Sequence, residues 1–193
     1  MSTPNSRFVP LSAELLEVIR VWRNSPRISD KMLSNQPISA AQQQSWFVGL
    51  EGDTERRYLV FCQEQTPVGM LYFTAITPAR CSWGCYIGAE AVWPGSGLLL
   101  EVAALDYAFD RLGVDCLHAE VLDFNLPPQR MHKVFGYRLV TTQPDALQRN
   151  GQQHALLHYE YACAEWQANR DKVIASLPRQ IREGIARISF TDY

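Results

Sequence analysis

Hydrophobic residues recur at helical spacing between residues 91 and 113, in the stretch AVWPGSGLLLEVAALDYAFDRLG. The apolar stripe consists of Leu98, Val102, Leu105, Phe109 and Leu112. Residues three or four positions apart line one face of an α-helix, so this stripe predicts a helix with one buried face. Apolar runs typical of strands flank the stretch, WGCYIG before it and CLHAEVLD after it. The pattern therefore predicts a strand, a glycine turn, a helix and a parallel strand.

The N-terminal part of the chain predicts an edge strand, two helices and two strands. The edge strand lies within residues 1–10, and the first helix starts at Ser12 or Ala13 and ends before Pro26, which disfavours helical geometry in the residue before it. Ser39 and Gln42 have the spacing of a capping box and begin the second helix. The runs RRYLVFCQ and TPVGMLYFTAI then predict two strands, joined by a turn over residues 65–67.

The C-terminal part predicts a short helix, two strands and a helical tail. The helix covers LPPQRMHKVFG, and Asn125 precedes it as a candidate cap. The strands cover residues 137–142 and 155–161, with the polar run QPDALQRNGQQ as a loop between them. The tail starts at Cys163 and is interrupted at Pro178. Its apolar stripe, which extends to Ile188, could pack on the chain's own sheet or on a second subunit, so a homodimer is possible.

This order of elements is typical of an α/β (α+β) fold, with a mixed, mostly antiparallel central sheet flanked by helices and one parallel βαβ crossover. We expect residues 1–193 to form a single domain, with residues 163–193 as a C-terminal helical tail, because one core is common at this length.

Composition narrows the possible partners and the location. The net charge is −2, which argues against nucleic acid or an anionic membrane as the main partner. No apolar run approaches about 18 residues, and the first ten residues lack the features of a signal peptide, so we expect a cytoplasmic protein. The five cysteines form no Cys-x-x-Cys pair, which favours reduced thiols over a disulfide framework.

The turn Gly95-Ser96-Gly97 opens the predicted helix. Backbone N–H groups at a helix start and the helix dipole together favour an anion, and glycine lets a phosphate approach closely. We therefore expect a phosphate-bearing ligand at Gly95, Ser96, Gly97 and Leu98, although a purely structural glycine turn would look the same. The run lacks Gly-Lys-Ser/Thr and has Leu100 where the dinucleotide motif has glycine, so neither of those phosphate loops matches.

With these elements in place, the chain resembles the GNAT acetyltransferases. Their motif Arg/Gln-x-x-Gly-x-Gly/Ala corresponds to residues 92–97, where both glycines match but Val92 replaces Arg or Gln. The resemblance implies acetyl-CoA, with its pyrophosphate on the turn and its pantetheine between splayed fourth and fifth strands. It also implies that Asn125 helps to bind acetyl-CoA, and that His132 occupies the position of the usual general-acid tyrosine.

Longer segments resemble the nucleotide-sugar acetyltransferases of pseudaminic acid synthesis: WRNSPRI, ISAAQQQSWF, PVGMLYFTAI, LEVAALDYAF and MHKVFGY. This resemblance implies direct transfer of acetyl from acetyl-CoA, in a ternary complex, to the 4-amino group of UDP-4-amino-4,6-dideoxy-N-acetyl-β-L-altrosamine. The glycan made downstream, on flagellin or in a surface polysaccharide, stays open. Two alternatives also stay open: an acetyltransferase of another amine (a protein N-terminus, a polyamine or an antibiotic), and a non-catalytic acyl-CoA-binding module.

Three residues are candidates for the chemistry, because amine acetylation needs an uncharged amine and a leaving thiolate. Glu120, in the strand-like run HAEVL, could accept the amine proton, and Tyr86 on the preceding strand could relay it. His132 could protonate the departing thiolate. Each has a plain structural alternative: a salt-bridged Glu120, a packed Tyr86 and a surface His132. No cysteine nucleophile is expected.

Four residues are candidates for binding the acceptor. Arg23 could bind the UDP pyrophosphate, since a guanidinium stays charged and binds phosphate through two N–H groups. Met32, Leu33 and Trp46 could form an apolar wall for the methyl group of the sugar. The alternatives are a surface salt bridge for Arg23 and core packing for the other three.

The remaining charged residues suggest no further site. Glu101, near the start of the central helix, is expected to complement the helix dipole. His154 and His158 are four residues apart in a segment that alternates like a strand, so no metal site is expected.

Overall fold

The computed structural model describes residues 2–191 and contains one eight-stranded sheet in the order β6-β7-β5-β4-β3-β2-β1-β8. The strands are β1 (Ser6–Pro10), β2 (Arg57–Gln63), β3 (Thr66–Thr74), β4 (Arg80–Ile87), β5 (Cys116–Leu122), β6 (Arg138–Arg149), β7 (Gln152–Ala162) and β8 (Ile188–Phe190). The helices are α1 (Leu16–Asn24), α2 (Pro26–Ser29), α3 (Ala40–Val48), α4 (Ser96–Asp106), α5 (Leu126–Phe135), α6 (Cys163–Ser176) and α7 (Arg179–Ile185). A 3-10 turn, η1 (Ala13–Leu15), precedes α1, and a π turn, η2 (Tyr107–Arg111), follows α4.

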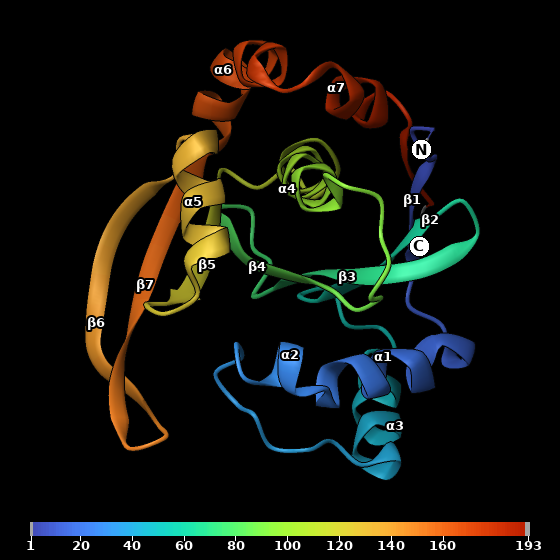
Figure 1. Ribbon diagram of the computed structural model, residues 1–193, viewed down its shortest axis with the longest axis vertical. Helices are drawn as coiled ribbons and strands as arrows, with labels where there is room; N and C mark the ends of the chain where they lie inside the picture. The colour runs from blue at the N-terminus through green and yellow to red at the C-terminus, as the bar shows by residue number, and fades with distance from the viewer. Residues whose placement is uncertain (1, 192–193) are drawn as a thin grey trace.

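The predicted fold class is confirmed. Helices α1, α2 and α3 cover one face of the sheet, while α4 crosses the other face with α6 and α7 above it (Figure 1). The strands pair antiparallel except at β4–β5 and β1–β8. Within residues 2–191, no helix combines the length and the apolar character that crossing a bilayer requires.

Strands β4 and β5 separate at the middle of the sheet. They pair over four residues, from Arg80 opposite Cys116 to Trp83 opposite Ala119. Beyond this point β4 continues to Ile87, paired only with β3, and β5 continues to Leu122, paired with β7. The two strands therefore diverge beyond Trp83, as the resemblance to the acetyltransferases implies, and we call the region between their unpaired edges the β4–β5 gap.

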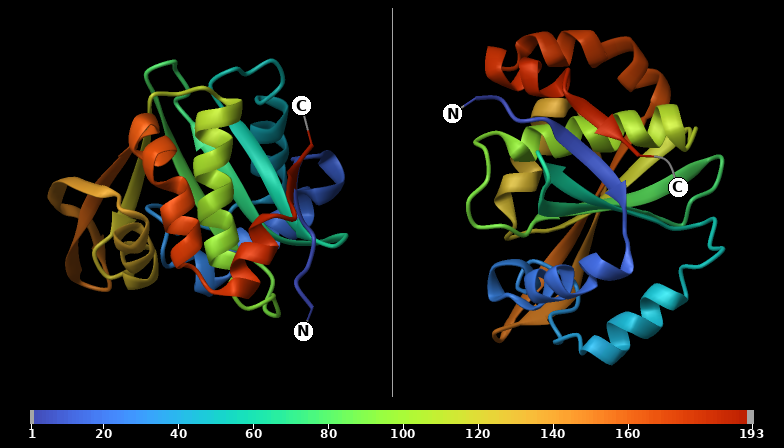
Figure 2. Two further views of the ribbon diagram at one scale, coloured as in Figure 1. Left: turned by 90° about the horizontal axis from the view of Figure 1, so that it is seen from above. Right: turned by 90° about the vertical axis from the view of Figure 1, so that its right-hand side faces the viewer.

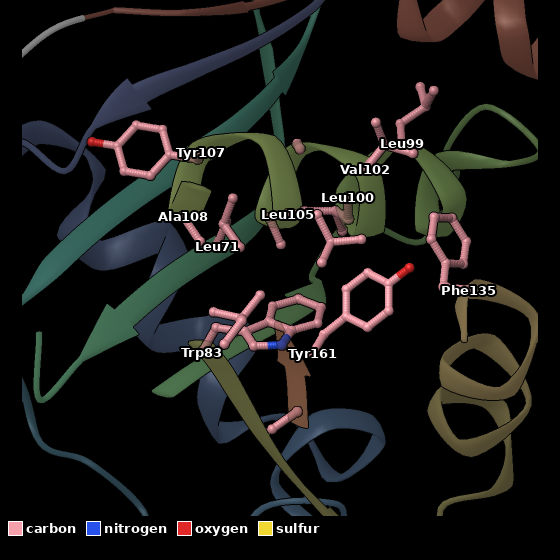
Figure 3. Close-up of a cluster of buried hydrophobic side chains, with 14 of the residues drawn as sticks. Leu71, Trp83, Leu99, Leu100, Val102, Leu105, Tyr107, Ala108, Phe135 and Tyr161 are labelled. Carbon is pink, nitrogen blue, oxygen red and sulfur yellow. The ribbon is translucent and has the colours of Figure 1, made fainter. Parts of the chain in front are cut away.

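Helix α4 differs from the one-faced helix that its stripe predicts, because it is buried on nearly all sides. The side chains beneath it, between α4 and the sheet, include Leu100 and Leu105 (Figure 3). Leu99 is equally buried, and the tail covers the outer face of the helix. Trp166 and Arg170 of α6 both donate hydrogen bonds to the Asp106 carboxylate, at 2.9 Å for the indole N–H and 2.8 Å for each guanidinium contact. The tail of this chain thus packs on its own central helix.

The predicted bounds of the C-terminal strand pair and of the helical tail both need correction. The polar run expected as a loop continues both strands, so β6 and β7 form a long hairpin closed by Asn150 and Gly151. Both residues have positive φ, 51° and 77°, which suits a tight two-residue hairpin turn. The tail is interrupted at Pro178 as predicted, but Ile188 belongs to strand β8 and not to a helix. Strand β8 pairs with β1, so β1 is not the edge strand that the sequence predicts (Figure 2).

The N-terminal predictions are confirmed in their main points. Helix α1 ends at Asn24, and Ser25 is extended before Pro26. The capping box of α3 is present: Gln42 N donates to Ser39 Oγ at 3.2 Å, and Ser39 N donates to Gln42 Oε1 at 2.8 Å. The turn between β2 and β3 is shorter than expected, since Thr66 and Pro67 already belong to β3.

Candidate active site

The glycine turn before α4 is fixed from two sides. Gly95 has φ +104°, and a Cβ there would lie 2.1 Å from Ile181 Cδ1 of α7, so only glycine fits. The hydroxyl of Ser96 is buried, donates to Trp93 O at 2.6 Å and accepts from Gln63 Nε2 at 2.7 Å. The side chain of Ser96 therefore ties the turn to β2.

Some backbone N–H groups of this turn donate hydrogen bonds within the turn, and others have no acceptor among the described residues. Ser96 N donates to Trp93 O at 3.1 Å, and Leu98 N donates to Gly95 O at 2.9 Å. The amides of Gly95 and Gly97 make no hydrogen bond within residues 2–191. A Cβ on Gly97 would meet only Met131 Cε, at 3.4 Å. The turn thus offers two unpaired N–H donors at the positive end of an 11-residue helix, a combination that suits an anion.

His132 lies inside the protein, against α4. It is 3% exposed, Glu101 is 4% exposed, and His132 Nδ1 lies 3.2 Å from Glu101 Oε1. A carboxylate oxygen accepts hydrogen bonds, so Nδ1 acts as the donor in this contact and Nε2 is the ring nitrogen left to face a ligand. Glu101 is therefore a buried partner of His132, and it lies beyond the first turn of α4, so the sequence-based expectation that it complements the helix dipole is wrong.

An aromatic cage surrounds His132. Its ring centroid lies 4.3 Å from Tyr137, 5.0 Å from Tyr159 and 5.9 Å from Trp83. The Trp83 indole N–H and the Tyr137 hydroxyl are buried without a hydrogen-bond partner among the described residues. Burial and, next, the Glu101 carboxylate raise the pKa of Tyr137 well above its ordinary value, although that carboxylate is not in hydrogen-bonding geometry with the hydroxyl. Two buried donors with no partner are rare and indicate where a ligand could bind.

Sequence reasoning missed Tyr137 and Trp83 as site residues. Tyr137 directly follows Gly136 at the end of the segment MHKVFGY, whose resemblance to the acetyltransferases is a signal that could have drawn attention to it. Trp83 carries no such signal, because its apolar neighbours in WGCYIG explain it equally well as core. Trp83 stands out only in the structure, where it is the last residue of β4 that pairs with β5.

Glu120 and Tyr86 lie on the other face of the sheet from His132. Ala119 and Val121 belong to the core beneath α4, so their neighbour Glu120 faces the side of α1. Tyr86 packs against a second cluster of buried apolar residues, separate from the core beneath α4. This second core cluster contains residues of α1. Burial raises the pKa of Tyr86, so its hydroxyl stays protonated near neutral pH. Glu120 is the first residue of β5 beyond the last pair with β4, so it lies where the two strands begin to separate.

Arg23 extends into the same face from the end of α1. Its Nη2 donates to Ser34 O at 2.6 Å, while its Nη1 is buried and has no partner among the described residues. Burial raises the pKa of Tyr86 and raises that of Tyr72 to about 12, and the Arg23 guanidinium partly opposes both shifts. The positive charge of Arg23 therefore acts on the two hydroxyls. Tyr72, which also feels the Glu120 charge, is a further residue of this face that sequence reasoning missed.

The other predicted binding residues are distributed around this face. The carbonyl oxygens of Met32 and Leu33 accept hydrogen bonds from Arg149 Nη2 at 2.9 and 3.4 Å, so β6 holds their loop. Trp46 packs edge-on against Tyr58 at 4.8 Å, within the second core cluster.

Asn125 precedes α5, but its side chain makes no capping hydrogen bond, contrary to the predicted cap.

Comparison with known proteins agrees with this geometry. A family model described as an acetyltransferase (GNAT) domain matches residues 7–138. Two relatives named Acetyltransferase PseH, from Campylobacter jejuni, are similar to the chain. That of strain 81-176 is 27% identical over 126 residues, covering 65% of this chain and 78% of the relative. That of strain NCTC 11168 is 29% identical over 118 residues, covering 61% and 73%.

Among solved structures, the fold is similar to the spermidine N-acetyltransferase from Vibrio cholerae in complex with CoA and spermine. The TM-score is 0.79 at 16% identity, covering 84% of this chain and 98% of that one. At this identity the similarity shows the fold alone. The family model covers more than half of the chain, and the relatives carry the same activity in their names. The protein is an N-acetyltransferase that belongs to the GNAT family.

Proposed function

We propose that this enzyme transfers the acetyl group of acetyl-CoA to the 4-amino group of a UDP-linked amino-dideoxy sugar, within the pseudaminic acid pathway. The observation that carries this acceptor is the similarity to the two PseH relatives, over about three quarters of their length. Arg23 gives independent support, because its buried, unpaired N–H lies beside the acceptor face and suits an anionic group such as a diphosphate.

In this proposal the glycine turn binds the pyrophosphate of acetyl-CoA. The unpaired amides of Gly95 and Gly97 donate to it, while Ser96 and Leu98 use their amides to hold the shape of the turn. The pantetheine arm lies along the free edge of β4, where the main chain beyond Trp83 has no pairing with β5. Asn125, whose side chain caps nothing, supplies a further polar contact.

Glu120 is the proposed acceptor of the amine proton. It lies where β4 and β5 begin to separate, and its side chain is 40% exposed, so water and the amine can both reach it. Tyr86 and the amine would share this face, and the protonated Tyr86 hydroxyl can pass a proton through hydrogen bonds without itself ionising. Deprotonation leaves the nitrogen lone pair free to form the new N–C bond.

His132 is the proposed donor to the leaving group. When the C–S bond breaks, the electron pair leaves on the CoA sulfur, and a proton from His132 converts the thiolate to the thiol. The Glu101 carboxylate stabilises the protonated ring before transfer and keeps Nδ1 protonated after it. His132 and Glu120 lie on opposite faces of the sheet, so the gap between β4 and β5 is the place where thioester and amine meet.

The acceptor would lie between the sheet and the loop after α2. Arg23 would bind the diphosphate, and Met32 and Leu33, in the loop held by Arg149, would contact the sugar. Trp46 would contribute from α3, next to Tyr58. The only partners in this proposal are acetyl-CoA and the UDP-amino sugar.

The experiment is a mass spectrum of the products after incubation with acetyl-CoA and the UDP-4-amino sugar. We expect one added acetyl group, on the 4-amine. Spermidine and a peptide with a free N-terminus serve as competing acceptors in parallel reactions. A thermal shift with UDP gives a second readout, because a ligand that binds only the folded state raises Tm. Acetylation of spermidine or peptide in preference to the sugar, without a UDP shift, would contradict the proposal.

A further inference from the structure

Three side chains with metal-ligating atoms meet on the acceptor face of the sheet. We propose that His118, Glu120 and His158 bind one divalent transition-metal ion, of which Zn²⁺ is the best candidate. One ligand atom of each residue lies within 4.8 Å of those of the other two. The sequence predicts no metal site, because only His154 and His158 were considered together and their four-residue spacing on one strand does not suit a metal. In the structure His158 of β7 instead meets His118 and Glu120 of the neighbouring strand β5.

Two of the three separations fit a metal better than they fit hydrogen bonds, and the third is within 4.8 Å. His118 Nε2 lies 3.4 Å from His158 Nδ1, and His158 Nδ1 lies 3.5 Å from Glu120 Oε1. Hydrogen bonds between such groups are shorter, at about 2.7–3.2 Å. Ligand atoms about 2.1 Å from a tetrahedral Zn²⁺ are about 3.4 Å apart, which is the edge of that tetrahedron.

The sheet holds the three residues in this arrangement. Glu120 lies opposite His158 in the β5–β7 register, and His118 precedes Glu120 by two residues on the same face. The two imidazole rings lie 5.4 Å apart at an angle of 25°. Ser82 Oγ of β4 lies 3.4 Å from His118 Nδ1. From this position Ser82 could orient the imidazole ring and direct Nε2 to the metal. Ligands on paired strands need little rearrangement to bind an ion.

The donor set also narrows the type of ion. Two imidazole nitrogens and one carboxylate oxygen suit Zn²⁺ and its neighbours in the first transition row better than Mg²⁺ or Ca²⁺. The side chain of Glu120 is 40% exposed and that of His158 is 17% exposed, so an ion can enter from solvent. Three protein ligands with one open side leave room for water as a fourth ligand.

Binding has a consequence for catalysis, which rests on the proposed role of Glu120. A carboxylate that ligates a metal ion cannot accept the amine proton. The ion would therefore inhibit acetyl transfer, and a chelator would restore it. Sensitivity of the transferase to Zn²⁺ is thus a secondary expectation, and metal binding itself does not depend on the acceptor.

The test is a titration of the chelator-treated, thiol-reduced protein with Co²⁺, followed by visible absorption. Tetrahedral Co²⁺ absorbs more strongly than hexa-aquo Co²⁺, so we expect a band that saturates at one equivalent and is displaced by Zn²⁺. In His118→Ala and in His158→Ala, we expect affinity to fall at least tenfold, and His158→Gln repeats the test with less loss of volume. Circular dichroism confirms that each variant is folded. No acetyl-CoA or amine is present, so the result is independent of the proposed function.

His154→Ala is the matched control. His154 is on the same strand and also pairs with a carboxylate, because its Nδ1 lies 3.0 Å from Asp123 Oδ1. We expect its Co²⁺ affinity to match that of the wild type. Absence of a saturable band in the wild type, unchanged binding by the folded His118 and His158 variants, or a near-ultraviolet band of sulfur ligation would each overturn the proposal.

Discussion

Nδ1 of His132 lies 3.2 Å from Oε1 of Glu101, and the two side chains reach this contact from different helices, α5 and α4. Both are almost completely buried, which is unusual for this pair of residue types. A buried carboxylate is stable only when it is paired, so each residue depends on the other. The contact also orients the His132 ring, which suits the role of proton donor proposed for it.

The first prediction concerns this pair. His132→Phe should lower kcat by about 10- to 100-fold, at the low end of general-acid effects, because a CoA thiolate with a pKa near 8.5 leaves with little assistance. Glu101→Gln should lower kcat by about tenfold, since the neutral amide no longer stabilises the protonated ring. Steady-state kinetics measures both, with KM for acetyl-CoA expected to change less than about twofold.

The double variant separates a shared role from two independent ones. If Glu101 acts only through His132, the double variant should be no slower than His132→Phe alone. Multiplicative losses would contradict the pairing. Near-ultraviolet circular dichroism is the control for the fold, because the aromatic cage around His132 contributes to that signal.

The second prediction concerns Glu120. Glu120→Gln should lower kcat/KM by about 100-fold and leave a rate that keeps rising with pH, since the amine must then lose its proton to solvent. A pH–rate profile for the UDP-amino sugar measures this. Glu160→Gln is the matched control, because Glu160 is also a strand carboxylate but pairs with Arg138 at 3.3 Å. A Glu120→Gln profile of wild-type shape would remove Glu120 from the mechanism.

The third prediction contrasts the two glycines of the turn. Gly97→Ala should leave the fold unchanged, since its Cβ would meet only the flexible Met131 at 3.4 Å, yet raise KM for acetyl-CoA if the pyrophosphate approaches this backbone. Gly95→Ala should lower Tm as well, because of the positive φ and the 2.1 Å approach to Ile181. Thermal unfolding and KM for acetyl-CoA separate the two effects. An unchanged KM in Gly97→Ala would argue against phosphate binding at this turn.

The fourth prediction concerns thiol reactivity. Burial raises the pKa of Cys81 and of Cys85 to about 12. A raised thiol pKa keeps the sulfur protonated and unreactive at neutral pH, with reactivity appearing only as the pH approaches that value. We expect both cysteines to resist iodoacetamide at pH 8 in the folded protein and to react after unfolding in urea. Peptide mapping measures this, and rapid alkylation of native Cys85 would contradict the environment described for β4.

The fifth prediction concerns the contact between the tail and α4. Asp106→Ala should destabilise the protein by about 1–3 kcal/mol, because the indole N–H of Trp166 and the guanidinium of Arg170 lose their shared acceptor. Urea unfolding measures the change. Asp171→Ala is the control, since that carboxylate is fully exposed and lies 3.9 Å from Arg170. Equal effects of the two substitutions would show that Asp106 does not hold the tail.

Local signals in the sequence predict local structure well. The capping residues Ser39 and Gln42 and the proline at position 26 each act on their immediate neighbours, and the structure has a helix start and a helix end where they predict. Asn150-Gly151 is a signal of the same kind, but the polar residues on either side of it obscured the hairpin. The residues beside the turn are polar because most of β6 and the first residues of β7 are exposed.

Long-range contacts are what the sequence could not supply. The apolar stripe of α4 predicts one buried face, and only the position of the tail explains why Leu99 is buried too. In the same way, no spacing along the chain brings His118 to His158, or Glu101 to His132. The glycine turn and the motif around His132 were found because each is a contiguous run of residues.

The contact between Ile181 and Gly95 links the end of the chain to the turn proposed to bind acetyl-CoA. A stop codon after β7 would leave every proposed catalytic residue in place. It would nevertheless remove the side chain that packs against this turn, and it would uncover the outer face of α4, where Leu99 lies. If the turn binds acetyl-CoA as proposed, mutations in α7 should raise KM for acetyl-CoA without changing a proposed catalytic residue, and screens for loss of activity should recover them there.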